Sequence, residues 1–469
     1  MVSGARNLVQ CNLKRMRCPE YGIKSSFRIT TAAVFLLLAS VAGFGQAETY
    51  PEPTPTPLAA AKAKPSPVVS PSPNPSPSVT PTPEPEADPP PPQVRYFFTD
   101  FPPNKTSWKS KYVDLNIAFA LLADYTFVGQ DAASKSQVGP QASIGDLRAG
   151  RFVFYGQFKT KRPIGYFVAA DFNEIRTPGQ RFFTWLDMYL IFRLWGNARL
   201  TVGKQKEPFI YEMVGDAANL PQQERFLNPF FVSRNVGIKY WQNFAKDKVL
   251  LQVGVFNDWF LTDFKKSGTQ VSGRLSGLPY RSKDGREYLH LAVGLRYNQA
   301  DDGVMRYRGR PENNKIDYYV DTGSFPAKNA KQISLEALYN RKGFSILAEY
   351  THAEVESKEM HNPGFSGFYT TASYVLSGEN RPYDKRVGYA RRIIPKSRFG
   401  AVELVGRFGY LEMEDTLIKG GRMAKWYGGA NWWASRTWKF GIGYGLARLD
   451  RFDTIGWTQY FITRIQWIY

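Results

Sequence analysis

The feature of this sequence that most constrains its fold is a two-residue alternation of apolar and polar side chains. In residues 112–127, "YVDLNIAFALLADYTF", every second residue from Val113 to Phe127 is apolar or aromatic, and the residues between them are mostly polar or small. Because successive side chains of a strand point to opposite faces, one face of this segment is apolar. The run is longer than most strands of globular proteins and suits a tilted strand that crosses a bilayer.

The same alternation recurs in four later segments, where the second face carries small or charged residues. These are residues 186–193, 289–296, 402–410 and 438–447. One apolar face and one wet face are typical of a transmembrane β-barrel, whereas a soluble sandwich would need its apolar faces to meet. The final stretch, "FITRIQWIY", alternates too. We expect its aromatic end to close the barrel seam, with Arg464 pointing into the lumen.

Fifteen strands follow from this pattern. They are expected near residues 112–127, 147–158, 164–173, 183–195, 198–206, 233–242, 248–258, 287–299, 331–341, 343–356, 367–378, 398–411, 423–434, 437–450 and 457–469. A bacterial barrel needs an even number of strands, and "GVMRYRGR" supplies a weak sixteenth near 303–310. The predicted fold is all-β, a transmembrane antiparallel β-barrel of sixteen strands, with short links at one end and long links at the other.

The barrel occupies only part of the chain. Residues 1–47 resemble a secretory signal peptide, because basic residues precede an apolar run and small residues precede a cleavage site. Residues 48–108 are predicted to form a disordered, Pro-rich periplasmic arm, since 17 of the 32 prolines lie between 51 and 92 and nothing there can bury a core. The arm is either a passive spacer or a contact to the cell wall. Residues 109–469 form the predicted barrel domain.

Composition argues against an enzyme and favours an anionic ligand. Cys11 and Cys18 precede the expected cleavage, so the mature chain has no thiol chemistry. His290, His352 and His361 show no metal-type spacing, and there is no Gly-rich phosphate loop before a helix. We expect no catalytic site, metal or cofactor. The mature chain carries a net charge of about +15, which suggests small anions, nucleic acid or a membrane surface. In a barrel the expected partners are outer-membrane lipid and small anions, and not nucleic acid.

Arginines on the expected inner face are candidates for lining a pore. They are Arg193, Arg296, Arg407 and Arg464. A charge on the lipid face would cost roughly 2–4 kcal/mol at the midplane, whereas the lumen is wet. Rings of Arg and Lys select anions, and the guanidinium fork matches phosphate oxygens. Alternatively, each arginine pairs with Glu336, Glu349 or Glu403 and braces the wall.

A long basic link breaks the rule of short turns. Residues 379–397, "ENRPYDKRVGYARRIIPKS", lie on what should be the short-turn, periplasmic side. The link is either a solvated turn or a segment folded into the pore mouth. In the second interpretation Arg386, Arg391 and Arg392 would meet anions.

Several stretches resemble the phosphate-selective porin O and P family. They are "TVGKQKEPF", "QERFLNPFFVSRNVGIKYW", "GFYTTASYVLSGENRPY", "FGAVELVGRFGYLEMED", "GGANWWAS" and "RIQWIY", in family order over roughly 110–469. The resemblance implies a sixteen-stranded, homotrimeric outer-membrane barrel for anion uptake, with both termini in the periplasm. It also implies that basic loops fold into the lumen and that a ladder of arginine and lysine leads to a constriction that binds inorganic phosphate or related oxyanions.

The same resemblance implies anion-binding roles for four residues of this chain. They are Lys204 and Lys206 in "VGKQKEPF", Arg225 in "QERF" and Arg234 in "SRN". Strict alternation from Leu200 and Val202 would instead place Lys204 on the lipid face, unless the strand ends or bulges there. The predicted function is an outer-membrane porin, a passive diffusion channel selective for anions. The alternatives are a general non-specific porin and a structural barrel that anchors the cell wall.

Overall fold

The computed structural model describes residues 107–172, 183–257, 268–300, 302–311, 313–415 and 417–469. The predicted signal peptide and all but the last two residues of the predicted arm lie outside the described residues. Among the residues that are described, no helix is long and apolar enough to cross a membrane.

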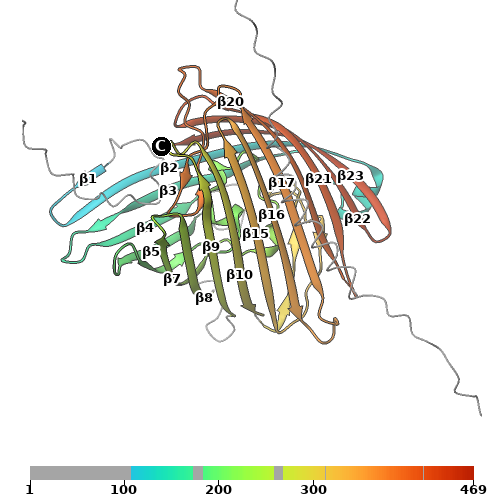
Figure 1. The fold of residues 1–469 in the computed structure, drawn as a ribbon. Coiled ribbons are helices and arrows are strands. Elements are labelled where there is room, and N and C mark those ends of the chain that lie inside the picture. Colours follow the sequence, from blue (N-terminus) through green and yellow to red (C-terminus); the bar gives the residue numbers. More distant parts are fainter. Residues whose placement is uncertain (1–106, 173–182, 258–267, 301, 312, 416) are drawn as a thin grey trace, which may run out of the picture. The chain divides into compact units, whose positions relative to one another are not determined.

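The described residues contain sixteen antiparallel strands of seven residues or more. They are β2 (Val113–Gln130), β3 (Ile144–Phe158), β4 (Ile164–Asp171), β5 (Thr184–Arg193), β6 (Arg199–Gln205), β7 (Asn235–Phe244), β8 (Val249–Asn257), β9 (Thr269–Arg281), β10 (Glu287–Gln299), β15 (Asn329–Arg341), β16 (Phe344–Glu356), β17 (Gly364–Val375), β20 (Ala401–Asp415), β21 (Ile418–Trp433), β22 (Trp438–Arg451) and β23 (Thr454–Ile468). Each strand pairs with the next one of this series, as Figure 1 shows.

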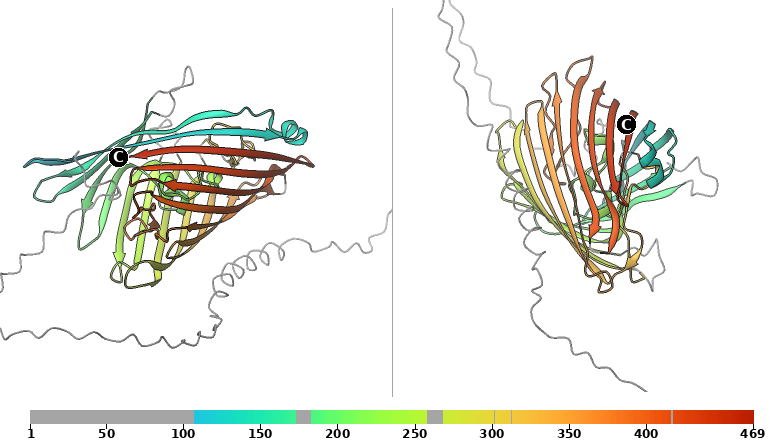
Figure 2. Two further views of the ribbon diagram at one scale, coloured as in Figure 1. Left: turned by 90° about the horizontal axis from the view of Figure 1, so that it is seen from above. Right: turned by 90° about the vertical axis from the view of Figure 1, so that its right-hand side faces the viewer.

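The ring closes between the first and last of these strands. β2 pairs with β3 on one side and with β23 on the other, and the three strands run side by side in both views of Figure 2. Phe119 and Tyr469 exchange backbone hydrogen bonds of 2.7 and 2.9 Å at this seam. The prediction of a closed antiparallel barrel of sixteen strands is therefore confirmed. A short strand, β1 (Ser107–Lys109), also pairs with β2, although Ser107 and Trp108 belong to the predicted arm.

The position predicted for the sixteenth strand is wrong. Residues 303–310 hold only the two-residue strands β11 (Val304–Met305) and β12 (Arg308–Gly309), which pair with β14 (Phe325–Pro326) and β13 (Val320–Asp321) inside one link. The missing barrel strand is β9. Its outer face alternates Val271 and Leu275 with glycines, so its "SGRLSG" core looks like a loop in the sequence. Parity gave the correct number of strands but could not locate the last one.

The two faces of the strands have the predicted characters. On β23, Phe461 and Ile465 are 44% and 49% exposed on the outer face, whereas Arg464 and Gln466 on the inner face are each 1% exposed. Large apolar side chains are exposed in the same way around the ring, including Leu295, Ile442 and many aromatic rings. An outer surface of this kind is suited to lipid, since water would disfavour it.

Both ends of the barrel carry short turns, which corrects one expectation. We call the end where β2 begins and β23 ends the terminal end, and the opposite one the far end. The predicted short links lie at the terminal end, together with the long β17–β20 link (376–400). The far end holds the long β6–β7 link (206–234) and β10–β15 link (300–328), but also a two-residue turn of Phe452 and Asp453. Both turn residues have positive φ, as tight hairpins require.

Three links turn inward and fill much of the barrel. Buried apolar residues of the β6–β7 link, among them Phe226 and Phe230, form one cluster with Tyr307 and Tyr319 of the β10–β15 link and with Tyr389 of the β17–β20 link. The same cluster includes inward side chains of the wall. Short elements give these links their shape: α3 (Tyr211–Val214), η1 (Ala217–Asn219), η2 (Asn228–Phe230), and β18 (Tyr383–Asp384) paired with β19 (Tyr389–Ala390). α2 (Ala132–Val138) lies at the far end and is N-capped by Asp131.

Candidate functional site

Carboxylates of the β6–β7 link hold it against arginines of the wall. Glu212 of the link accepts a hydrogen bond from Arg407 of β20 at 2.6 Å, and neither side chain is exposed. Glu207 accepts from Arg296 of β10 at 2.7 Å, again in a buried pair. The carboxylate of Glu212 also accepts the backbone N–H of Phe226, at 2.8 Å. Removing one partner of such a buried pair leaves an uncompensated charge, so these contacts fix the link to the wall.

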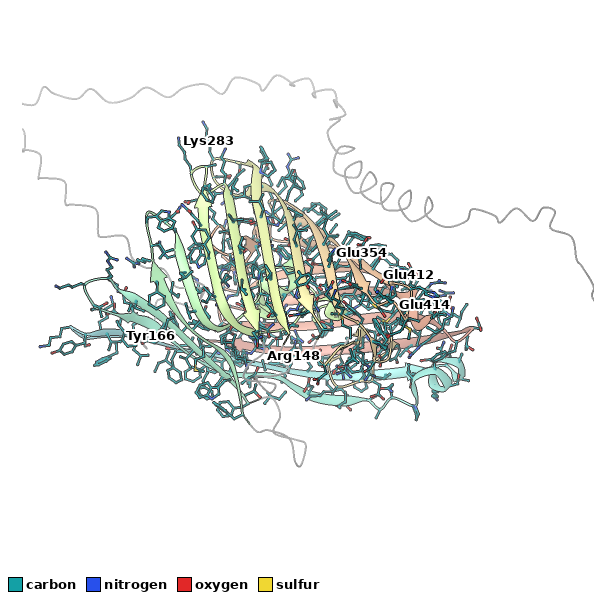
Figure 3. All side chains as sticks on the ribbon, turned by 90° about the horizontal axis from the view of Figure 1, so that it is seen from below. Arg148, Tyr166, Lys283, Glu354, Glu412 and Glu414 are labelled. Carbon is teal, nitrogen blue, oxygen red and sulfur yellow. The ribbon has the colours of Figure 1, made fainter. Side chains whose placement is uncertain are left out.

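Glu224 makes a third attachment, close to the seam. It accepts from Arg464 of β23 at 3.1 Å and from Arg148 of β3 at 3.2 Å, and Arg464 also pairs with Asp124 of β2 at 2.6 Å. Figure 3 shows Arg148 within the body of the barrel, whereas Lys283 extends from a turn. Burial would raise the pKa of Glu224, but the two guanidinium groups outweigh it and lower the pKa to about 2. Glu224 is therefore ionised at neutral pH.

The β17–β20 link is also attached to the wall, through β9 and β20. Arg381 of the link pairs with Glu403 of β20, with both side chains buried. Arg274 of β9 pairs with Glu336 of β15 and donates to the backbone carbonyl of Gly388 at 2.8 Å. The two links also meet each other, because the N–H of Ala390 donates to Tyr211 Oη at 3.0 Å and Asn219 donates to Tyr389 Oη at 2.9 Å. The basic link is thus folded inward.

Two adjoining pockets remain between the links and the β2–β8 side of the wall. The first, the Lys206 pocket, has about 580 Å³ of empty space, solvent at its mouth included. It is lined by Phe167, Asp187, Tyr189, Gln205, Lys206, Glu207, Pro208, Val214, Asp216, Lys239, Gln252, Val387 and Tyr389. Burial lowers the pKa of Lys206 to about 8, although Asp216 lies 2.8 Å away and opposes that shift.

The second, the Arg392 pocket, has about 600 Å³ of empty space and shares Asp187 and Asp216 with the first. It is lined by Ala120, Arg151, Val153, Ala169, Leu186, Asp187, Asp216, Ala218, Asn219, Arg234, Arg391, Arg392 and Ile468. Four guanidinium groups therefore border this space with only two carboxylates. Arg234 pairs with Asp187 at 3.0 Å, and Arg151 pairs with Asp171 at 2.8 Å. Arg391 pairs with Asp384 at 3.0 Å. Asp171 and Asp384 are not lining residues, so the excess of cations applies to the lining alone.

The predicted site residues divide into three groups. Arg296, Arg407 and Arg464 lie inside the barrel and pair with carboxylates of the β6–β7 link, not with Glu336, Glu349 or Glu403 as the bracing alternative proposed. Lys206, Arg234, Arg391 and Arg392 line the two pockets. The others are spread over the molecule.

That third group lies outside the pockets. Arg225 is half-buried and donates to the carbonyl oxygens of Glu212 and Gly215. Arg386 lies 3.5 Å from Asp384 and is partly exposed. Arg193 is exposed near the terminal end of β5. Lys204 belongs to the outward set of β6, next to Val202, and donates to the Trp185 carbonyl at 2.7 Å. It therefore does not line the lumen as the resemblance implied, and the strict alternation gave its correct face.

Sequence reasoning missed two pocket cations. Arg151 alternates with outward Phe152 on β3, so its inward direction could have been inferred from the pattern. Lys239 of β7 directly follows exposed Ile238, so its side chain points to the inner face and could have been found in the same way. Within the described ranges, no group of His, Cys, Asp and Glu side chains could hold a metal ion.

The chain is similar in sequence to one porin family and to curated proteins. The sequence model for phosphate-selective porin O and P matches residues 122–453. An uncharacterised protein of Caulobacter vibrioides is 26% identical over 283 residues, covering 56% of this chain and 56% of the relative. Porin O of Pseudomonas aeruginosa is 24% identical over 217 residues, covering 39% of this chain and 49% of the relative. This chain spans about half the length of the curated relatives it matches.

Two solved structures share the fold. The trimer form of OmpT, an outer-membrane protein of Vibrio cholerae, has a TM-score of 0.51 and 9% identity, covering 76% of this chain and all of that one (100%). The outer-membrane channel DcaP of Acinetobacter baumannii has a TM-score of 0.51 and 11% identity, covering 78% of this chain and 100% of that one. These likenesses show an outer-membrane β-barrel fold. Since the family match spans well over half of the sequence, the chain belongs to the phosphate-selective porin O and P family.

Proposed function

We propose that this protein is an outer-membrane porin that passes small anions, phosphate or related oxyanions among them, through the Lys206 and Arg392 pockets. The observation that supports it is the charge of these pockets. Six cationic side chains and three carboxylates line the two together. Walls of low dielectric focus a positive potential of this kind and raise the local anion concentration. Several moderate sites also let an ion leave again, which a single tight site would not.

The remaining expectations belong to the same proposal. The terminal end, with its short turns, faces the periplasm, where the Pro-rich arm is either a passive spacer or a contact to the cell wall. The protein forms a homotrimer, as the family suggests. It acts as a channel and not as an enzyme. The outer apolar surface supports contact with outer-membrane lipid.

A second function is favoured by a specific observation. The apolar cluster of the three links occupies much of the lumen, as a structural barrel that anchors the cell wall would allow. A closed barrel of that kind conducts no ions. Conductance in a planar bilayer separates the two proposals, because only the porin produces stepwise currents.

The test is the reversal potential of the purified protein in a KCl gradient. We expect chloride to be more permeant than potassium, and Arg392→Gln and, separately, Lys206→Gln to lower the permeability ratio. Arg436→Gln is the control, since Arg436 is exposed on a terminal-end turn outside both pockets. Heat-modifiable migration of each variant confirms that the barrel has folded. A cation-selective parent would reject the function, and equal ratios in all variants would reject the site.

A further inference from the structure

One part of the inner wall is apolar, although the lumen of a porin is usually polar. Inward side chains of β2 to β5 form a separate buried cluster, which we call the apolar strip. It consists of Ala118, Val153, Tyr155, Phe167, Ala169 and Tyr189, joined by Ala218 of the β6–β7 link and Ile468 of β23. Phe167 and Tyr189 stack with ring centroids 5.2 Å apart. The strip is distinct from the cluster that packs the three links together.

The apolar strip borders the pockets as well as packing against the β6–β7 link. Phe167 and Tyr189 line the Lys206 pocket, and Val153 and Ala169 line the Arg392 pocket. Ala218 and Ile468 line the Arg392 pocket too. An apolar surface therefore extends from one pocket into the next.

Cations line both pockets together with this strip. Lys206 borders the pocket with Phe167 and Tyr189, while Arg391 and Arg392 of the β17–β20 link border the pocket with Val153 and Ala169. A small inorganic ion would use only the charged side, because apolar wall gives it nothing in return for the water it loses. An ion with an anionic head and an apolar body would use both sides.

We propose that the pockets select organic anions that carry an aromatic or aliphatic body, such as aryl carboxylates or phosphonates, over inorganic anions and their methyl analogues. The anionic group lies against the arginines and Lys206, and the body lies against the apolar strip. This inference rests on the proposed function, since it requires that anions enter the pockets. It assigns to the strip a role in specificity that the charges alone cannot supply.

A matched pair of probes tests the proposal. Phenylphosphonate and methylphosphonate share one anionic head and differ only in the body, so their block of single-channel chloride current isolates the apolar contribution. Burying the additional ring surface should make phenylphosphonate block at a concentration about tenfold lower. Inorganic phosphate should resemble the methyl compound.

Two substitutions in the strip locate the effect. Val153→Thr keeps the shape of the side chain and adds a hydroxyl, and Tyr189→Ser removes a ring. Both should reduce the preference for the phenyl probe while the block by methylphosphonate changes less than twofold. Ile442→Thr, on the outer face of β22, is the control. Val153→Thr keeps the test open if Tyr189→Ser fails to fold.

Each outcome has a distinct meaning. A parent channel without anion selectivity would overturn the proposed function itself. An anion-selective channel that both phosphonates block equally would overturn only this inference. A phenyl preference that persists unchanged in both strip variants would place the apolar contact elsewhere and reject the strip. A preference lost in the variants and kept in the control supports it.

Discussion

The two sides of this barrel use arginine for different purposes. On the β9–β23 side, Arg274, Arg407 and Arg464 have side chains with no exposed surface, and each faces a carboxylate at hydrogen-bond distance. On the β2–β8 side, Arg151 and Arg234 also pair with carboxylates but keep 19% and 9% of their side chains exposed, and the space that they border is lined by more cations than acids. We call these the attached side and the pocket side.

The difference teaches that an inward arginine is not by itself a pore residue. Its function depends on whether its ion pair is enclosed by packed side chains or borders an open pocket. The β6–β7 link brings Glu207, Glu212 and Glu224 to the wall and neutralises arginines there. The pocket cations have carboxylate partners too: Arg151 pairs with Asp171, Arg234 with Asp187, and Lys206 with Asp216 of the same link. What sets the pocket side apart is that its ion pairs border open space whose lining holds more cations than carboxylates.

The largest expected effect is on the attached side. Arg407→Ala leaves Glu212 buried without its partner, so we expect the free energy of unfolding to fall by about 3–5 kcal/mol. Urea unfolding of the detergent-solubilised barrel measures this loss. Arg422→Ala is the matched control, because its pair with Glu412 is about half exposed, and we expect a change of about 0–1 kcal/mol. Equal losses in both variants would show that burial does not set the contribution of these pairs to stability.

The next largest effect is a pH dependence of the ion selectivity, which arises on the pocket side. Burial lowers the pKa of Lys206 to about 8, against the opposing charge of Asp216. A lysine loses its positive charge as pH rises through its pKa, so Lys206 is mostly charged at pH 7 and mostly neutral at pH 9. We expect the chloride-to-potassium permeability ratio to fall between these values. Lys206→Arg keeps the charge at both pH values and should show a smaller fall in the ratio. An identical fall would show that Lys206 does not cause the pH dependence.

A smaller effect sharpens the account of the attached side. Glu349 of β16 is buried, and it accepts hydrogen bonds from the Tyr211 N–H at 2.7 Å and from Tyr369 Oη at 2.9 Å. It makes no ion pair among the described residues. Glu349→Gln keeps an oxygen acceptor and the shape, so we expect the unfolding free energy to change by less than about 1 kcal/mol. Glu212→Gln, which leaves Arg407 unpaired, should cost several times more in the same assay.

The smallest effect lies outside both sides. Deleting residues 51–92 should leave barrel assembly and conductance unchanged, because this Pro-rich segment has no aromatic side chain and only four aliphatic ones larger than alanine, too few to bury a core. Heat-modifiable migration and single-channel recording of the deletion variant check this. Loss of assembly would assign the arm a structural role.

The sequence predicted the wall well and the interior poorly, for a physical reason. Alternation is local, so the inward direction of Arg464 and even the outward direction of Lys204 could be inferred from their neighbours. Partners are not local: Arg407 and Glu212 are separated by 195 residues. Nothing in the sequence near Arg407 indicates which acid will reach it. The glycines of β9 show the converse limit, because a real strand with little apolar side chain gives almost no signal.

The seam between β2 and β23 has a consequence for how fast the protein can fold. Arg464 and Asp124, which pair across it, are separated by 340 residues. Contacts between residues so distant in the chain carry a large loop-closure entropy and form late. Until β2 and β23 pair, each strand has an unpaired backbone edge that can associate with other chains. The buried pair of Arg464 and Asp124 forms only when the ring closes. We therefore expect it to slow reopening of the barrel more than it speeds closure.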